Sequence, residues 1–152
     1  VTHADSSTVI YSYSGTDVTI TDENAHPTTQ HWQAFGGPGN GRLVGVTDAE
    51  SQAWTYSYNV FGSLTRVDAP QGPDRVWEYN SANRLTSETQ PESGTTGYTY
   101  DAAGLLATKT DALNRTTTYH YDANHRLTEI VAPVPTDGGR TRLTSASRDD
   151  LL

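Results

Sequence analysis

The chain has 152 residues and a formal net charge of −8, from 18 Asp and Glu against 10 Lys and Arg, and it contains no Cys. This acidity excludes nucleic acid and anionic membrane surfaces as expected partners, because like charges repel. The absence of Cys excludes disulfides and thiolate metal sites, and an apolar content of 34% with nine Tyr favours thin sheets over a thick aliphatic core.

Residues 1–29 are predicted to form a degenerate β-repeat. Tyr11 and Tyr13 lie two residues apart, which is the spacing of side chains on one face of a strand. The N-terminus lacks the basic and apolar regions of a signal peptide, and the chain does not begin with Met. No run of 18 apolar residues occurs. We therefore expect a piece of a longer protein that does not insert into a membrane.

Residues 30–133 are predicted to form an array of β-hairpins with a period of 21 residues. Tyr recurs at this spacing from Tyr58, and Leu does so from Leu43. Each Tyr ends a Tyr-x-Tyr strand or a Trp-x-Tyr variant, and Asn or Asp follows it into a short turn. The period predicts two strands per repeat and little or no helix. The residues that define the repeat are Tyr58, Gly62, Leu64, Tyr79, Leu85, Tyr100, Asp101, Gly104, Leu106, Tyr121, Asp122 and Leu127.

The turns are predicted to need one residue with positive φ, which Gly62, Asn83 and Gly104 can provide at low cost. His125 breaks this rule in the fourth turn, and the neighbouring Asn124 is expected to serve instead.

Two stretches depart from the period. Trp32 takes the Tyr place of an imperfect repeat, and residues Gly37–Gly41 lengthen its turn. Residues 134–152 are polar and rich in Gly, Ser and Thr, which predicts a linker-like tail or a partial repeat. Specificity is expected in these two stretches, because the repeat does not account for them.

The pattern Tyr-x-Tyr-Asp-x-x-Gly-Arg-Leu, kept best in Tyr98–Leu106 and Asp111–Leu127, resembles the Rhs and YD-repeat superfamily. That group includes bacterial Rhs polymorphic toxins, components of insecticidal toxin complexes, wall-associated repeat proteins and teneurins. The resemblance implies an all-β fold, in which antiparallel hairpins form a twisted strip and a segment of a spiralling shell. The self-cleaving protease segment of many Rhs cores has no match here, so the resemblance implies the scaffold role alone.

No residue is predicted to be catalytic, to bind a cofactor or to bind a metal. Asp101, Asp111 and Asp122 recur with the repeat or its connections, as turn residues should, whereas a catalytic pair is singular. His120 and His125 span a strand end and a turn, so their rings need not face one metal site. His26 and His31 are expected to flank a turn, with less to indicate a metal site. The glycines of Gly36–Gly41 precede a predicted strand, whereas a phosphate loop precedes a helix.

The predicted function is a non-catalytic scaffold, a segment of a hollow β-shell that encloses or presents a toxin domain. An alternative is a cell-surface adhesion or carbohydrate-binding module on which sugars stack against Trp32, Trp54 and Trp77. If the protein were an enzyme, its activity should disappear when a single acidic residue or His is changed. Expected partners are flanking repeats of a longer chain, and an enclosed toxin domain or a cell-surface glycan. The open edges of the sheet are also expected to allow self-association. The expected location is secreted or on a bacterial cell surface.

Overall fold

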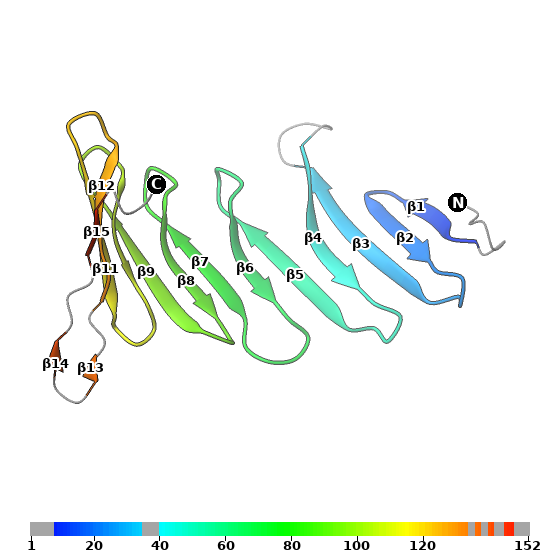
Figure 1. The fold of residues 1–152 in the computed structure, drawn as a ribbon. Helices are drawn as coiled ribbons and strands as arrows, with labels where there is room; N and C mark the ends of the chain where they lie inside the picture. Colours follow the sequence, from blue (N-terminus) through cyan, green and yellow to red (C-terminus); the bar gives the residue numbers. More distant parts are fainter. Residues whose placement is uncertain (1–7, 35–39, 134–135, 138–139, 142–144, 148–152) are drawn as a thin grey trace. The chain divides into compact units, whose positions relative to one another are not determined.

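The computed structural model describes residues 8–34, 40–133, 136–137, 140–141 and 145–147. Every regular element in these ranges is a β-strand, and paired strands run antiparallel, which confirms the predicted all-β hairpin fold. The chain divides into two compact units, residues 1–75 and 76–152. Each unit is a meander in which strands adjacent in sequence pair with one another (Figure 1). No helix in the part of the chain described here is long and apolar enough to cross a membrane.

The first unit contains six strands that pair in chain order. Its long central hairpin joins the eight-residue β3 to the seven-residue β4. The strands are β1 (Ile10–Ser14), β2 (Asp17–Thr21), β3 (Pro27–Ala34), β4 (Gly41–Thr47), β5 (Ala53–Tyr58) and β6 (Leu64–Asp68).

The second unit continues the pattern with six further strands that pair in chain order. They are β7 (Arg75–Tyr79), β8 (Leu85–Gln90), β9 (Gly94–Tyr100), β10 (Leu106–Thr110), β11 (Thr116–Tyr121) and β12 (Leu127–Val131). Three short strands follow: β13 (Thr136–Asp137) pairs with β14 (Arg140–Thr141), and β15 (Ser145–Ser147) pairs with β12. Two strands of the array therefore correspond to each 21-residue repeat, as predicted.

A β-bulge follows the repeated Leu in five hairpins. Tyr58 lies opposite Leu64 whereas Ser57 lies opposite Arg66, so Thr65 is the extra residue on β6. The register shifts at the same point of the β3–β4, β7–β8, β9–β10 and β11–β12 pairs. A bulge increases the local twist of the two strands and re-aims the side chains beside it. Each Tyr, or Trp32 in the first copy, therefore stays opposite its Leu across the strand pair.

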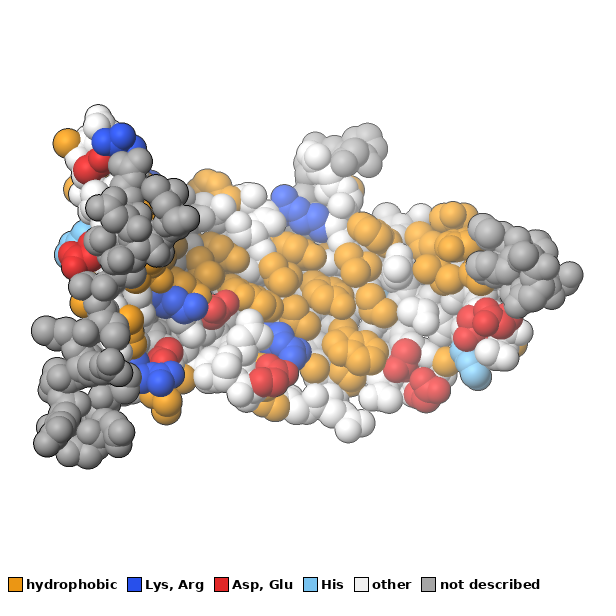
Figure 2. Space-filling view, in the orientation of Figure 1, with side chains coloured by type: hydrophobic (Ala, Val, Ile, Leu, Met, Phe, Trp, Pro, Cys, Tyr) orange, Lys and Arg blue, Asp and Glu red, His pale blue; other side chains and the backbone are white. Residues whose placement is uncertain are grey.

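The alternation of strand side chains gives each unit two unlike faces. In β5 the side chains of Trp54, Tyr56 and Tyr58 lie on one face and are half-buried, while the residues between them are exposed. Figure 2 shows hydrophobic side chains gathered on the face turned toward the viewer. No hydrophobic side chain in the described ranges is fully buried. Each unit is thus a single sheet layer whose apolar face is only partly shielded from water.

Two details of the sequence prediction were wrong. His125 itself takes the positive φ of 61°, and Asn124 does not, because the turn fixes the position of the left-handed residue and not its type. His31 lies inside β3 and pairs with Asp17 and Gly45 on the neighbouring strands, so it does not flank a turn. Most of the predicted Gly37–Gly41 loop lies outside the residues described.

Candidate functional surface

The face with the repeated rings is called the aromatic face, and within each unit it is built from equivalent positions of successive strands. In the first unit it carries Tyr11, Tyr13, Trp32, Trp54, Tyr56, Tyr58 and Leu64. In the second unit it carries Trp77, Tyr79, Leu85, Tyr98, Tyr100, Leu106, Tyr119, Tyr121 and Leu127. The predicted repeat-defining Tyr and Leu residues therefore lie together on one face of their unit.

A hydrogen bond from the repeated Tyr joins a hairpin to the preceding one at three positions of the array. The Tyr58 hydroxyl donates to the Leu43 carbonyl oxygen at 2.8 Å. The same bond joins Tyr100 to Leu85 at 2.7 Å and Tyr121 to Leu106 at 3.0 Å. The phenol therefore satisfies a backbone acceptor at the bulge while its ring covers the aromatic face. This bond fixes the register of neighbouring hairpins, which sequence spacing alone did not reveal.

An arginine directly before the repeated Leu lies over the tyrosine of the next repeat. The Arg42 guanidinium carbon lies 5.5 Å from the centroid of the Tyr58 ring, and that of Arg84 lies 5.8 Å from the Tyr100 ring. A Cβ at Gly62 would overlap the Arg42 guanidinium, and a Cβ at Gly104 would overlap that of Arg84. Any other residue at these positions would displace the arginine from the ring, and glycine also takes the positive φ at low cost.

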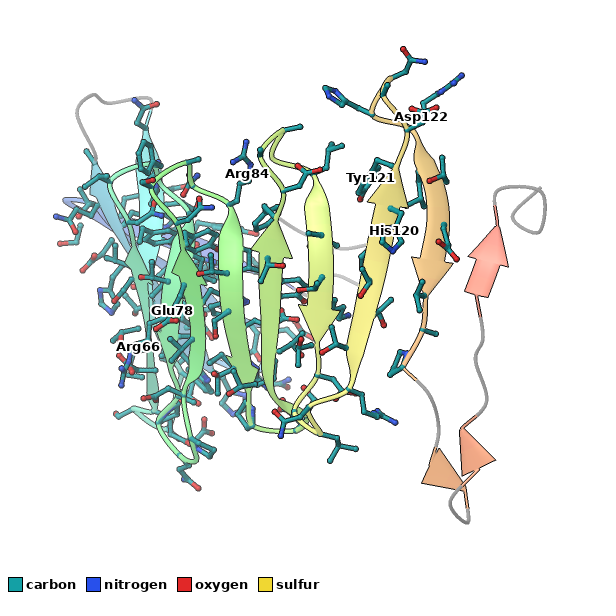
Figure 3. The ribbon with its side chains drawn as sticks, turned by 90° about the vertical axis from the view of Figure 1, so that its left-hand side faces the viewer. Arg66, Glu78, Arg84, His120, Tyr121 and Asp122 are labelled. Carbon is teal, nitrogen blue, oxygen red and sulfur yellow. The ribbon has the colours of Figure 1, made fainter. Side chains whose placement is uncertain are left out.

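The turns at both ends of the hairpins share one design. An Asp or Asn accepts backbone N–H bonds from the residues two and four positions later, as Asp122 does from Asn124 and Arg126 at 2.9 Å each. The fourth residue of the turn then takes positive φ, as His125 does. Figure 3 shows Asp122 at the tip of the β11–β12 hairpin, with Tyr121 and His120 following along β11. The turns at Asp22, Asp48, Asn59, Asn80 and Asp111 are alike.

The opposite, polar face is rich in threonine and charged side chains. Hydroxyls of cross-strand threonines share hydrogen bonds of 2.6–3.0 Å, as in the Thr99–Thr108 and Thr19–Thr29 pairs. Arg66 pairs with Asp68 and Asp74 on this face of the first unit. The threonine pairs hold neighbouring strands together across a surface that offers little apolar burial.

One row of side chains on the polar face has the Asp–His–hydroxyl order of a serine-hydrolase catalytic triad. His31 Nδ1 lies 3.2 Å from Asp17 Oδ1, and His31 Nε2 lies 3.2 Å from Thr47 Oγ1. Asp17 and His31 are opposite one another in the strand register, and their side chains are each 40% exposed. The row continues the threonine pairs next to it, so we interpret it as a cross-strand ladder. In the described residues, no three His, Asp or Glu side chains group so that they could hold a metal ion.

Several tyrosine hydroxyls on the aromatic face have raised pKa values. Burial raises the pKa of Tyr58, Tyr79 and Tyr121. Burial also raises the pKa of Tyr98, and the Glu88 carboxylate adds to this shift by accepting the hydroxyl hydrogen bond at 2.5 Å. These rings therefore stay neutral at physiological pH.

The three predicted ligand-stacking tryptophans differ in exposure. Trp32 is 37% exposed, and its indole N–H donates to Gln30 Oε1 at 3.3 Å. Trp54 and Trp77 are half-buried on the aromatic face of their units. Trp32 is thus the one of the three whose ring is most open to a ligand.

Sequence reasoning missed the contacts of Arg42 and Arg84. A signal was present, because Arg42 is followed 20 residues later by Gly62, and Arg84 by Gly104. Where Ser63 or Leu105 takes the Arg place, Asn83 or His125 takes the Gly place. The two positions vary together in the sequence, as is expected of residues in contact, and the contact is seen where Arg and Gly occupy them.

Comparison with known proteins fits this geometry. The RHS Repeat family model matches residues 38–74, 79–112 and 100–139, which together exceed half of the chain. The chain belongs to the RHS repeat family. No curated protein matches it significantly.

Solved structures of Tc toxin components share the fold of this RHS repeat chain. A crystal structure of TcdB2-TccC3-Cdc42 is similar with a TM-score of 0.67 and 16% identity, over 90% of this chain. The structure of the Photorhabdus luminescens Tc holotoxin pore is similar with a TM-score of 0.70 and 15% identity, over 94% of this chain. The chain spans 8% of the length of each matched chain. Repeats of this kind are generally structural, and the likeness is one of fold.

Proposed function

We propose that this chain is a non-catalytic wall segment of a hollow β-shell that encloses or presents a toxin domain, in a secreted or cell-surface bacterial protein. The observation that carries the proposal is the repeated bond from Tyr58, Tyr100 and Tyr121 to the Leu carbonyl of the preceding hairpin. A joint that recurs between hairpins of both units lets a strip grow by adding hairpins, as in other repeat proteins. Family membership and the fold of Tc toxin components support the same function.

The wall role also agrees with the incomplete burial of the aromatic face. Within the described residues no apolar side chain is fully buried, and Tyr98 and Tyr100 are only half-buried. A contiguous face of this kind is typical of a surface that contacts another protein layer. We therefore propose that flanking repeats and the enclosed domain are the natural partners of the strip.

The proposal is tested on the full-length protein expressed from the gene that encodes this chain. The enclosed domain is expected to resist a protease that digests the same domain when it is expressed alone. A Tyr100→Ala plus Tyr121→Ala double variant should open the wall and restore cleavage, whereas Thr99→Ala plus Thr118→Ala on the polar face should not. Equal digestion of the free domain and of the domain within the full-length protein would contradict the enclosure.

A second candidate function is carbohydrate binding, which the exposure of Trp32 favours. An exposed indole offers a flat apolar surface on which a sugar ring can stack. A glycan array probed with the full chain should then give a signal that Trp32→Ala abolishes and Trp32→Phe retains. A signal that is unchanged in Trp32→Ala would exclude this ring as the platform.

A further inference from the structure

An open hollow on the aromatic face of the second unit has a lining that the shell function does not require. Its volume is about 440 Å³, within the roughly 300–1,000 Å³ of small-molecule sites. It lies where β10 leads into β11, since Lys109 is opposite Thr117 in the strand register. The lining residues are Lys109, Asp111, Arg115, Thr117, Tyr119 and Pro133.

The positive charge of the hollow comes from Lys109, the only lysine of the chain. Arg115 is occupied, because its Nε and Nη2 lie 2.7 and 2.6 Å from Asp111 Oδ2. The other oxygen of Asp111 accepts two backbone N–H bonds at 3.0 Å. Lys109 Nζ lies 5.9 Å from the Tyr98 ring centroid, and among the described side chains no carboxylate is within ion-pair distance of it. Lys109 therefore keeps its N–H donors available for an anion.

Two hydroxyls beside Lys109 are also available. In the described residues the Thr117 and Tyr119 side chains make no hydrogen bond, although both line the hollow. Tyr119 also offers the face of a half-buried ring. The hollow thus combines one cation, two hydroxyls and an aromatic ring, while its one carboxylate is already paired.

We propose that this hollow binds an acidic sugar, a hexuronate whose carboxylate meets Lys109 and whose ring lies against Tyr119. A carboxylate satisfies the ammonium by a charge-assisted hydrogen bond, and a pyranose supplies hydroxyls for Thr117 and an apolar face for the ring. An acidic peptide side chain would satisfy Lys109 but leave the hollow and the ring largely uncovered. This site is separate from Trp32, and a titration of the chain alone probes it with no enclosed domain against the aromatic face.

The test is a titration of the ¹⁵N-labelled full chain, followed by NMR at low salt. The probes are sodium galacturonate, neutral galactose, glutarate and a triglutamate peptide. Galacturonate should shift the amide signals of Thr117 and Tyr119 in a saturable way, with galactose at least about tenfold weaker. Lys109→Gln should weaken galacturonate by at least about tenfold, and Lys109→Arg should retain binding.

The control for net charge is Arg126→Gln, which also removes one positive charge but lies in the turn at the other end of β11. Its exposed guanidinium pairs with Asp122 and not with the hollow. Binding equal to that of the unmodified chain is expected. Tyr119→Leu should weaken galacturonate while leaving glutarate unchanged, because it removes the ring and its hydroxyl but not the cation.

Three results would overturn the proposal. Glutarate binding as tightly as galacturonate would reduce the site to a simple anion site. Tighter binding of triglutamate would make an acidic peptide its ligand. A galacturonate response that is absent, or that persists in Lys109→Gln, would show that the hollow binds no acidic sugar through Lys109.

Discussion

Single hydroxyl groups decide how one repeat is joined to the next. The Tyr58 hydroxyl bonds the Leu43 carbonyl, whereas the Tyr56 hydroxyl, two residues earlier on the same face, makes no hydrogen bond in the described residues. Tyr58→Phe should therefore lower the free energy of unfolding by about 1 kcal/mol, since it removes the hydrogen bond to the Leu43 carbonyl. Tyr56→Phe is the matched control and should be close to neutral. Denaturant unfolding measures both, and equal effects would contradict a specific role for the Tyr58 bond.

A second residue-scale prediction concerns the Arg84 and Gly104 pair. Gly104→Asn should destabilise the chain by about 1 kcal/mol, because the new Cβ displaces Arg84 from the Tyr100 ring. In an Arg84→Ser background the same change should cost less, since Asn tolerates positive φ and Ser63 already precedes Asn83 in a neighbouring repeat. A double-mutant cycle should give a coupling of about 0.5–1 kcal/mol. Additive effects would show that the two side chains do not interact.

At the scale of the element, the turns make stability depend on pH. The hydrogen bonds from the Arg115 side chain lower the pKa of Asp111, and the Arg126 backbone N–H bond lowers that of Asp122. A carboxyl whose pKa is lower in the folded state stabilises the fold above its unfolded pKa, and this contribution is lost as the pH falls through the folded value. The chain should therefore lose stability progressively as the pH falls below about 5.

The repeats of the chain itself show that Asn can replace Asp in these turns, and such a change tests the pH dependence. Asn80 makes the same turn as the aspartates, with its Oδ1 accepting N–H bonds at 3.0 and 2.9 Å. An Asp111→Asn plus Asp122→Asn double variant should thus keep the fold and show a smaller fall of the melting temperature on acidification. Asn80→Asp should show a larger one. Identical acid profiles measured by circular dichroism would assign the pH dependence to other groups.

The sequence predicted these elements better than it predicted the contacts between them. Tyr58 and Leu64 marked the strand ends because their spacing reports directly on the period of the hairpin. The contact of Arg84 with the next turn could not be read from one repeat, since it depends on how neighbouring hairpins stack. The hollow beside Lys109 could not be predicted from the sequence, because a hollow is a property of several strands together. His125 was misjudged because the residue preference of a turn was given more weight than its geometry.

At the scale of the whole chain, each unit is a sequence of local pairings without a closed core. Strands of the hairpin array pair with their neighbours in sequence, and burial is partial throughout the described residues. Stability in such a chain is expected to be a sum over repeats and the joints between them. The strand at the start of the order, β1, has side chains that are exposed along its whole length.

The exposure of β1 leads to a prediction about self-association. Tyr11 and Tyr13 on its aromatic face are 46% and 75% exposed, and β1 pairs with β2 on one side. An exposed apolar edge strand recruits another strand, and a charge on it opposes this pairing. Tyr13→Lys should therefore reduce the sedimentation-detected dimer or higher oligomer of the isolated chain. Val60→Lys is the matched control, because Val60 is 95% exposed at a hairpin tip and adds the same charge away from the edge. If both variants reduce association equally, net charge and not the β1 edge governs it.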